Sequence, residues 1–281
     1  MSLWTSLLAL LGTNIVERPL ELPRKAAFYG VVNHFWYQAS DKQIDQYVKA
    51  LHDNGWFGTI IELRGPFAQF GGSNPYTFDV MLKKADRLAR TCEKYGMWLW
   101  VVDENYNSPY VRRSLNDQKE DARKVISTLG GYKRIILQGA SEVISTKVDN
   151  GAHMSKGLEL MEFYANAWKV PQVWWVGNTP MALSTPGWAE IADWHISSIG
   201  AGGRVPKKIN TLNTDHSTIL AAMLGGSKEG QKWDLPDVDT LWSRAKTEQK
   251  WMVLYHFWGK QPDYDCIKHG IRMWGKNGSW R

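Results

Sequence analysis

Residues 78–104, FDVMLKKADRLARTCEKYGMWLWVVDE, contain the pattern that decides the fold. In the first part, apolar residues recur every three or four positions, which predicts an amphipathic helix over Phe78–Tyr95 that ends at Gly96. The uninterrupted apolar run that follows predicts a buried strand over Met97–Val102. This strand leads into a carboxylate pair, Asp103–Glu104. A helix that connects directly to a fully buried strand is typical of α/β folds with a parallel sheet.

The same alternation recurs from residue 26 to the end of the chain. It predicts eight strands, at Tyr29–Phe35, Thr59–Leu63, Met97–Val102, Arg134–Gln138, Gln172–Val176, Asp193–Ser197, Lys208–Leu212 and Trp251–Phe257. It also predicts helical segments at Asp41–Asn54, Phe78–Tyr95, Asp117–Leu129, Ser155–Ala167, Pro186–Ile191, Ser217–Leu224, Val238–Gln249 and Pro262–Trp274. We expect Ser40 to cap the first of these helices and Gly55 to end it.

Eight strands that alternate with helices predict a single (β/α)8 TIM barrel over residues 26–281, with residues 1–25 as a short N-terminal extension. The length of 281 residues agrees, because one such barrel needs about 250. A doubly wound open sheet is the alternative, since the Gly-rich connection 199–206 is too short for a helix. No glycine fingerprint or phosphate-binding loop follows a predicted strand, so we expect no cofactor.

The composition excludes several classes of protein. Hydrophobic residues make up 43% and charged residues 22%, which argues against disorder and fibrous folds. Two cysteines, Cys92 and Cys266, exclude a disulfide scaffold, and we expect both to be free thiols. No apolar run approaches the roughly 20 residues of a membrane span. The apolar run Leu3–Leu11 has no preceding positive residue, so a short amphipathic helix is favoured over a degenerate secretory signal.

Charge and tryptophan content point to the kind of ligand. The net charge of +6 is spread along the chain, so we do not expect nucleic acid as a partner. The 16 tryptophans exceed what a core of this size needs. Surplus indole rings supply flat apolar platforms, which sugar rings, nucleobases and membrane interfaces all use.

The predicted strand ends carry the residues that could perform chemistry, because the active site of such a barrel lies at the carboxyl ends of its strands. The carboxylates there are Glu62, Asp103, Glu104, Glu142 and Asp215. The candidates for ligand contact are His34, Trp36, Arg64, Trp175, Asn178, His195, His216, His256 and Trp258. Paired carboxyl groups together with aromatic platforms suit hydrolysis of a glycosidic bond in a carbohydrate ligand.

At these positions the sequence resembles known barrel enzymes. The stretches that carry the resemblance are Phe35-Trp36, Asp41-x-x-Ile44, Leu51-x-x-x-Gly55, Glu62-x-Arg64-Gly65, Gly96-Met97-x-x-Trp100-x-x-Asp103-Glu104, Ile209–His216, Gly225-Gly226 and Asp239-x-x-Trp242. The stretches up to Glu104 look like TIM-barrel glycoside hydrolases of the rhamnosidase-like and β-galactosidase-like kind, and the stretches from Ile209 onward resemble related, uncharacterised barrel hydrolases. The resemblance implies a retaining or inverting glycosidase. Related barrels often carry Asn-Glu at the end of the fourth strand, whereas this chain has Gln138-Gly139-Ala140.

Within this hypothesis, Glu104 acts as the general acid and Asp215 as the base, across the barrel mouth. A carboxyl separation of about 5–5.5 Å would mean retention and about 6.5–9.5 Å inversion, and we favour inversion. Asp215 could instead cap a helix that starts at Ser217, and Glu62 could form a purely structural salt bridge with Arg64.

Two other functions remain alternatives. Because Gln138-Gly139-Ala140 replaces the Asn-Glu of related barrels, the chain could instead be a non-catalytic carbohydrate-binding barrel in a larger surface or particle assembly. An Asp-His pair beside further histidines also allows a metal-dependent hydrolase. The tight spacing of a zinc site is absent from the sequence, so we expect no metal ligands.

Overall fold

We describe the fold from a computed structural model of the chain. The described residues are 26–31, 33–64, 77–105, 113–141, 150–175, 194–201, 219–224, 232–233, 235–247, 251–256 and 261–274. The predicted helices Leu3–Leu11 and Pro186–Ile191 and the predicted strand Lys208–Leu212 lie outside them. No helix in the described part of the chain is long and apolar enough to cross a membrane.

The described strands form one parallel sheet. They are β1 (Ala27–Val31), β2 (Gly58–Glu62), β3 (Trp98–Asn105), β4 (Ile135–Ser141), β5 (Val173–Trp175), β6 (Trp194–Ala201), β7 (Ile219–Leu224) and β8 (Trp251–His256). Each strand pairs with the next in chain order. The last strand, β8, pairs in turn with β1, from Ala27 opposite Met252 to Val31 opposite His256. The parallel α/β fold expected from the sequence is therefore confirmed.

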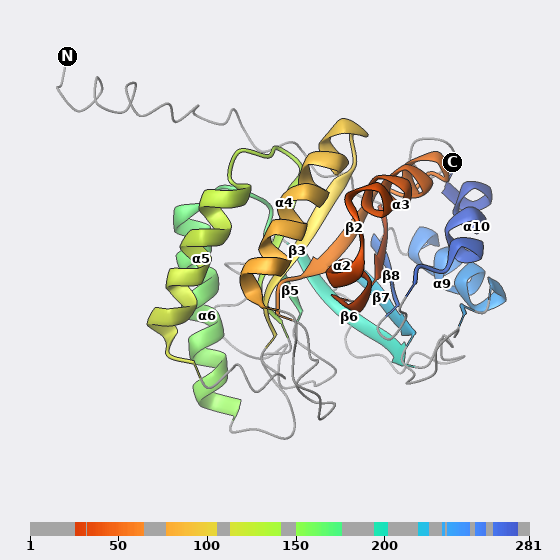
Figure 1. The fold of residues 1–281 in the computed structure, drawn as a ribbon. Helices are drawn as coiled ribbons and strands as arrows, with labels where there is room; N and C mark the ends of the chain where they lie inside the picture. Colours follow the sequence, from red (N-terminus) through yellow and green to blue (C-terminus); the bar gives the residue numbers. More distant parts are fainter. Residues whose placement is uncertain are drawn as a thin grey trace, which may run out of the picture.

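Helices cover the outer face of this sheet (Figure 1). They are α2 (Asn33–Gln38), α3 (Asp41–Asp53), α4 (Phe78–Lys94), α5 (Leu115–Leu129), α6 (Asn150–Ala167), α9 (Leu235–Thr247) and α10 (Tyr264–Trp274). Neighbours in the layer pack in the order α9, α10, α3, α4, α5 and α6, so that α5 and α6 lie on the opposite side of the strands from α9 and α10 (Figure 1). Within the described residues, helices follow β1, β2, β3, β4, β7 and β8.

Local sequence signals explain where the first long helices begin and end. Ser40 caps α3: its hydroxyl accepts a hydrogen bond from the Gln43 backbone at 3.3 Å, and the Gln43 side chain accepts one from the Ser40 backbone at 2.9 Å. This reciprocal pair is a capping box. Gly55 and Gly96 follow α3 and α4 with φ of 79° and 67°, a left-handed conformation that favours glycine.

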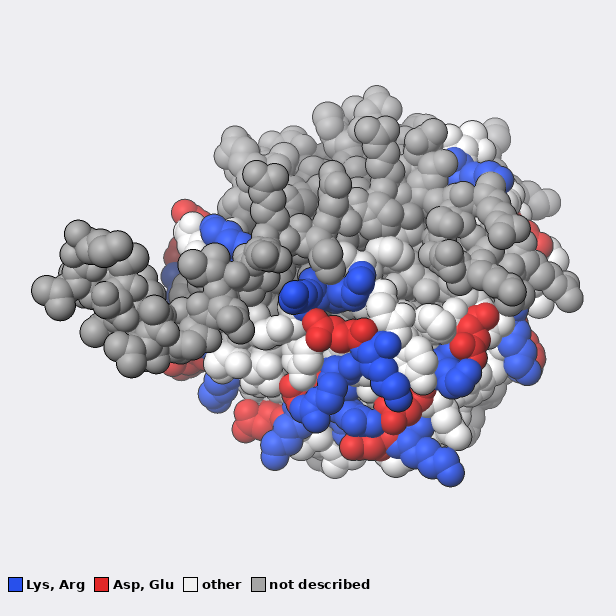
Figure 2. Space-filling model, turned by 90° about the horizontal axis from the view of Figure 1, so that it is seen from above, with Lys and Arg blue, Asp and Glu red and all other residues white. Residues whose placement is uncertain are grey.

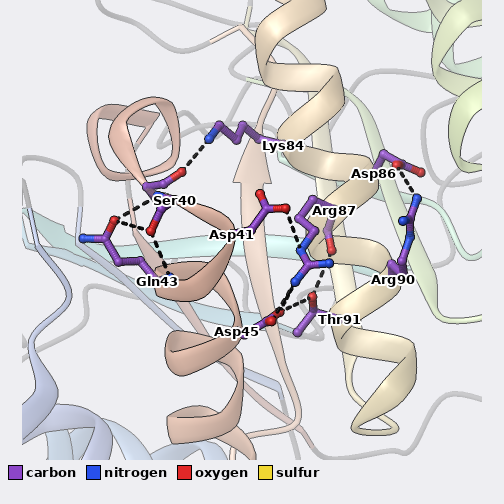
Figure 3. Close-up of polar contacts among 10 residues, drawn as sticks. Ser40, Asp41, Gln43, Asp45, Lys84, Asp86, Arg87, Arg90 and Thr91 are labelled. Carbon is purple, nitrogen blue, oxygen red and sulfur yellow. Dashed lines mark hydrogen bonds and ion pairs between the residues drawn. The ribbon is translucent and has the colours of Figure 1, made fainter.

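Ion pairs join α3 to α4 on the outside of the molecule (Figure 3). The guanidinium of Arg87 on α4 contacts both carboxylate oxygens of Asp45 on α3, at 2.7 and 2.6 Å. Its Nε lies 3.6 Å from Asp41, and the hydroxyl of Thr91 donates to Asp45 at 2.9 Å. These contacts fix the spacing of the two helices in the helix layer.

Buried apolar residues form two cores, one on each face of the sheet. The outer core lies between strands and helices and includes both cysteines, which are free thiols as expected. The inner core contains residue 26 and strand residues alone among its buried members, which are Ala26, Phe28, Ile60, Trp98, Trp100, Val102, Ile136, Val173, Trp251 and Val253. Inward-facing positions of β1, β2, β3, β4, β5 and β8 therefore point to the centre of the sheet's curve.

Three of the differences between the predicted and the observed elements bear on the candidate site. The first strand ends at Val31, and residues 33–35, which were predicted to continue it, lie in α2 instead. The third strand runs on to Asn105, so the Asp103–Glu104 pair lies within β3. The predicted helix over Ser217–Leu224 is wrong, because Ile219–Leu224 is strand β7, paired with β6 and β8 along its length. Backbone pairing with two neighbouring strands outweighs the helix propensity of this segment.

Candidate functional site

A row of three inward-facing side chains crosses β2, β3 and β4 near their carboxyl ends. Glu62 pairs in register with Val102, and Val102 pairs with Gln138. Glu62 lies two residues after the inner-core Ile60, and Gln138 lies two residues after Ile136, which places both on the inner face. We call Glu62, Val102 and Gln138 the inner row. It brings a carboxyl group and an amide to one level of the sheet.

The inner row is buried. Glu62 is 2% exposed and Gln138 is 1% exposed. The indole Nε1 of Trp100, two residues before Val102 on β3, donates to Gln138 Oε1 at 3.1 Å. Buried polar groups at the carboxyl ends of parallel strands are the usual starting point of a binding or active site in such folds.

The other face of β3 carries a different cluster. Asp103 is fully buried on the helix side of the sheet, where it accepts a hydrogen bond from the Tyr164 hydroxyl on α6 at 2.6 Å. The Nε of Arg64 lies 3.7 Å from Asp103 Oδ1. The same guanidinium binds Asp121 on α5 and lies 4.1 Å over the ring of Phe78. We call Arg64, Asp103, Asp121 and Tyr164 the buried ion cluster.

The two acids of this cluster differ in their preference for a proton. Burial raises the pKa of Asp103, and this effect exceeds the opposing effects of Arg64 and of the Tyr164 hydroxyl. Burial also opposes ionisation of Asp121, but Arg64, Arg113 and Lys124 outweigh it and lower the pKa of Asp121. In these contacts Asp103 and Arg64 link the ends of β2 and β3 to the helix layer.

The structure shows the backbone position of Glu104, the other half of the carboxylate pair. It lies in β3 opposite Ala140 of β4, one residue after the helix-facing Asp103. Consecutive strand positions belong to opposite faces of a sheet, so position 104 belongs to the inner face. The strand β4 extends to Ser141, so Glu142 is the residue that directly follows it in the sequence.

Trp36 occupies a different place from the one expected of a ligand platform. It lies in α2, is fully buried, and packs edge-on against Tyr47 and Phe35, with ring centroids 5.1 and 5.0 Å apart. These contacts give Trp36 a packing role, because a ring that stacks on a sugar needs an open face.

The remaining predicted residues fall into two groups. The backbone of four is described: His34 lies in α2, Trp175 ends β5, His195 is the second residue of β6, and His256 ends β8. Five lie outside the described residues: Glu142, Asn178, Asp215, His216 and Trp258. The expectation that Asp215 and His216 end the seventh strand is wrong, because both precede β7 in the sequence.

Sequence reasoning missed Tyr164, Asp121 and the inner-face position of Gln138. The one available signal was the polar Gln138 directly after the apolar run Ile135–Leu137, since a buried amide in a strand needs a hydrogen-bond partner. Tyr164 and Asp121 lie on helices whose rotation about their axes depends on packing. Their contacts with Asp103 and Arg64 therefore could not be read from the sequence.

No group of three or more potential metal ligands occurs among the described residues. The view from above shows positive and negative side chains intermixed over the described part of that face (Figure 2).

No protein-family profile and no curated protein sequence matches this chain. Solved structures do match in fold. A glycoside hydrolase aligns over 87% of this chain and 68% of its own, with a TM-score of 0.60 and 11% identity. A glycoside hydrolase family 5 from Bacteroides vulgatus aligns over 82% of this chain and 57% of its own, with a TM-score of 0.57 and 11% identity. D-allulose 3-epimerase from Methylomonas sp. aligns over 90% of this chain and 98% of its own, with a TM-score of 0.53 and 10% identity.

At these identities the comparisons show a shared fold. The chain has a glycoside-hydrolase-like, TIM-barrel-type α/β fold, and it spans just over half of the family 5 enzyme. The epimerase shows that the same fold carries other chemistry, so the activity has to be argued from the site.

Proposed function

We propose that this chain is a complete (β/α)8 barrel that binds a carbohydrate at the carboxyl ends of its strands and hydrolyses a glycosidic bond with paired carboxylates. The observation that carries the proposal is the position of two acids at the carboxyl ends of the neighbouring parallel strands β2 and β3, with a third acid next in the sequence after β4. Glu62 ends β2, Glu104 is the last residue but one of β3, and Glu142 directly follows β4 in the sequence. Glycosidic hydrolysis needs two carboxyl groups around one bond.

We assign the general acid to Glu104. Its neighbour Asp103 is committed to Tyr164 and Arg64 on the helix side, which leaves Glu104 as the acid of that pair on the inner face. For the second carboxylate we assign Glu142 in place of Asp215, because β3 and β4 are paired up to Asn105 and Ser141. Glu62 is assigned to ligand contact from the neighbouring strand.

The carbohydrate contacts stay as proposed from the sequence, apart from the buried Trp36, Arg64 in the ion cluster, and His216, which precedes β7. They are His34, Trp175, Asn178, His195, His256 and Trp258. The similarity in fold to glycoside hydrolases supports a carbohydrate as the ligand class. The intermixed charges on the described part of the face in Figure 2 form no polyanion footprint there.

The test is the release of reducing ends from a panel of glycans by the parent and by Glu104→Gln and Glu142→Gln. Loss of a general acid or base is expected to lower kcat by about 10²–10⁴-fold, with sugar binding retained. Glu159→Gln on α6 is the matched control, because Glu159 is exposed and about half accessible. Activity of either variant within a few-fold of the parent would contradict its assigned role.

A barrel that binds sugar without cleaving it is the second candidate. The sequence Gln138-Gly139-Ala140 favours this candidate, since β4 carries an amide and no acid at these positions. It predicts that the parent binds glycans in calorimetry and releases no reducing ends, and that the two glutamine variants bind as the parent does.

A further inference from the structure

Gln138 of the inner row holds its side-chain amide in one orientation. An indole Nε1 is a donor and cannot accept a hydrogen bond, so the amide atom that faces Trp100 at 3.1 Å is the oxygen. The amide nitrogen, Nε2, must then point away from Trp100 with two N–H donors. The identity of the two amide atoms therefore follows from chemistry.

Gln138 Nε2 is buried and has no hydrogen-bond partner among the described residues. Buried donors are nearly always satisfied, by protein, ordered water or ligand, because an unmade hydrogen bond in a site without water is costly. The donor lies on the inner face, in register through Val102 with the carboxylate of Glu62. It also lies three positions before the end of β4, about 10 Å below the edge of the sheet.

The chemistry of the inner row selects the kind of group that can satisfy it. Gln138 offers a donor, and Glu62, two strands away, offers carboxylate oxygens that accept. With strands about 4.8 Å apart, the two backbones are roughly 10 Å from each other, so both side chains can reach opposite edges of one ligand. A donor and an acceptor together suit hydroxyl groups, whereas the carboxylate disfavours an anionic ligand.

We propose that Gln138 determines specificity in the carbohydrate site: its Nε2 donates to a hydroxyl or ring oxygen of a neutral sugar, while Glu62 accepts from another hydroxyl of the same sugar. This inference rests on the proposed function and names the substrate class of that site, a sugar with free hydroxyls at the end that enters the barrel first. The role of Gln138 is binding, and no bond is made or broken at it.

The experiment is calorimetric titration with glucose, mannose, galactose, rhamnose, N-acetylglucosamine and glucuronate, using the full chain. Gln138→Met removes both amide atoms at similar volume. Gln138→Glu keeps an oxygen toward Trp100 and replaces the Nε2 donor by a second oxygen. This variant provides the test if Gln138→Met does not fold. Both are expected to weaken binding of the preferred neutral sugar by about tenfold or more, the scale of one buried hydrogen bond.

Gln172→Met is the matched control. Gln172 is also buried next to a strand, but its Nε2 donates to the backbone carbonyl of Val170 at 3.3 Å. We expect this variant to bind sugar as the parent does.

The outcomes separate the inference from the proposed function. Equal affinity of the parent and of both Gln138 variants for a neutral sugar would overturn the role of Gln138 and leave the proposed function standing. Preferential binding of glucuronate would contradict the proposal that the ligand is a neutral sugar. If the parent binds none of these sugars, the proposed function fails and the inference fails with it.

Discussion

At the scale of single residues, the most informative feature is the different use of two neighbouring acids in β3. Asp103 is directed to the helix layer and held by Tyr164 and Arg64, so it cannot also serve the inner face. The charge of Arg64 is shared with Asp121, which also contacts Arg113 at 2.6 Å. A buried guanidinium that loses one acid is left with uncompensated charge, so this cluster is where stability should depend most on single substitutions.

We expect Asp121→Asn to lower the free energy of unfolding by about 3 kcal/mol at pH 7, because Arg64 loses a buried partner. The unfolded chain has an ordinary aspartate pKa of about 3.9, and the folded pKa of Asp121 is lower. The stability that Asp121 contributes is therefore complete above the unfolded pKa and is lost as pH falls through the folded pKa. In urea unfolding, the stability difference between parent and variant should therefore begin to narrow as pH falls below about 4, and it should vanish below the folded pKa.

Glu120→Gln is the control for this substitution. Glu120 lies on the same helix and pairs with Arg123 at the exposed surface, at 2.5 Å. We expect a change within about 0.5 kcal/mol, as for other exposed ion pairs. A gap between parent and Asp121→Asn that stays constant down to pH 2 would contradict the role of the charge.

At the scale of elements, the packing of α6 on β4 depends on a glycine. A Cβ atom at Gly139 would lie 2.8 Å from the ring of Tyr164, closer than real contacts allow. The missing side chain thus lets Tyr164 approach the sheet closely enough to reach Asp103 on the neighbouring strand. Strand β4, helix α6 and the buried ion cluster are therefore coupled through one residue without a side chain.

We expect Gly139→Ala to lower the free energy of unfolding by about 1–3 kcal/mol, the usual cost of overpacking a core. The control is Gly131→Ala, where an added Cβ meets nothing within 4 Å. Thermal unfolding followed by near-ultraviolet circular dichroism measures both, since Tyr164 contributes to the signal. Equal stability of the two variants would show that α6 moves away at no cost.

At the scale of the whole molecule, the beginning and the end of the chain are connected by more than the pairing of β1 with β8. The carboxylate of Asp263, just before α10, accepts from the backbone of Trp233 at 2.9 Å and of Cys266 at 3.1 Å. Its backbone N–H donates to the hydroxyl of Tyr29 on β1 at 2.9 Å. This residue therefore ties the first strand to the last two helices.

We expect Asp263→Ala to lower the free energy of unfolding by about 2 kcal/mol, since it removes a helix cap and leaves the buried Trp233 amide unpaired. Asp265→Ala is the control. Its pairing with Lys232 is exposed on both sides, so a change below about 1 kcal/mol is expected. Chemical unfolding measures the free energy of unfolding of both variants. A larger decrease for Asp265→Ala than for Asp263→Ala would contradict this role of Asp263.

The sequence predicted the parallel α/β fold, the caps at Ser40, Gly55 and Gly96, and free cysteines. These follow from periodicity and from the conformations open to single residues, and both are local properties. It failed at Ile219–Leu224, where pairing with two neighbouring strands decides for strand, and therefore misplaced Asp215.

Other features of the candidate site needed the tertiary structure. Because β3 continues past Val102, Asp103 falls on the outer face, and because register joins three strands, Glu62 and Gln138 share one level. The face that a strand residue occupies changes with a shift of one position. The sequence alone therefore identified the candidate polar residues at the strand ends. The register of the sheet decided which of them lie on the same face and at the same level.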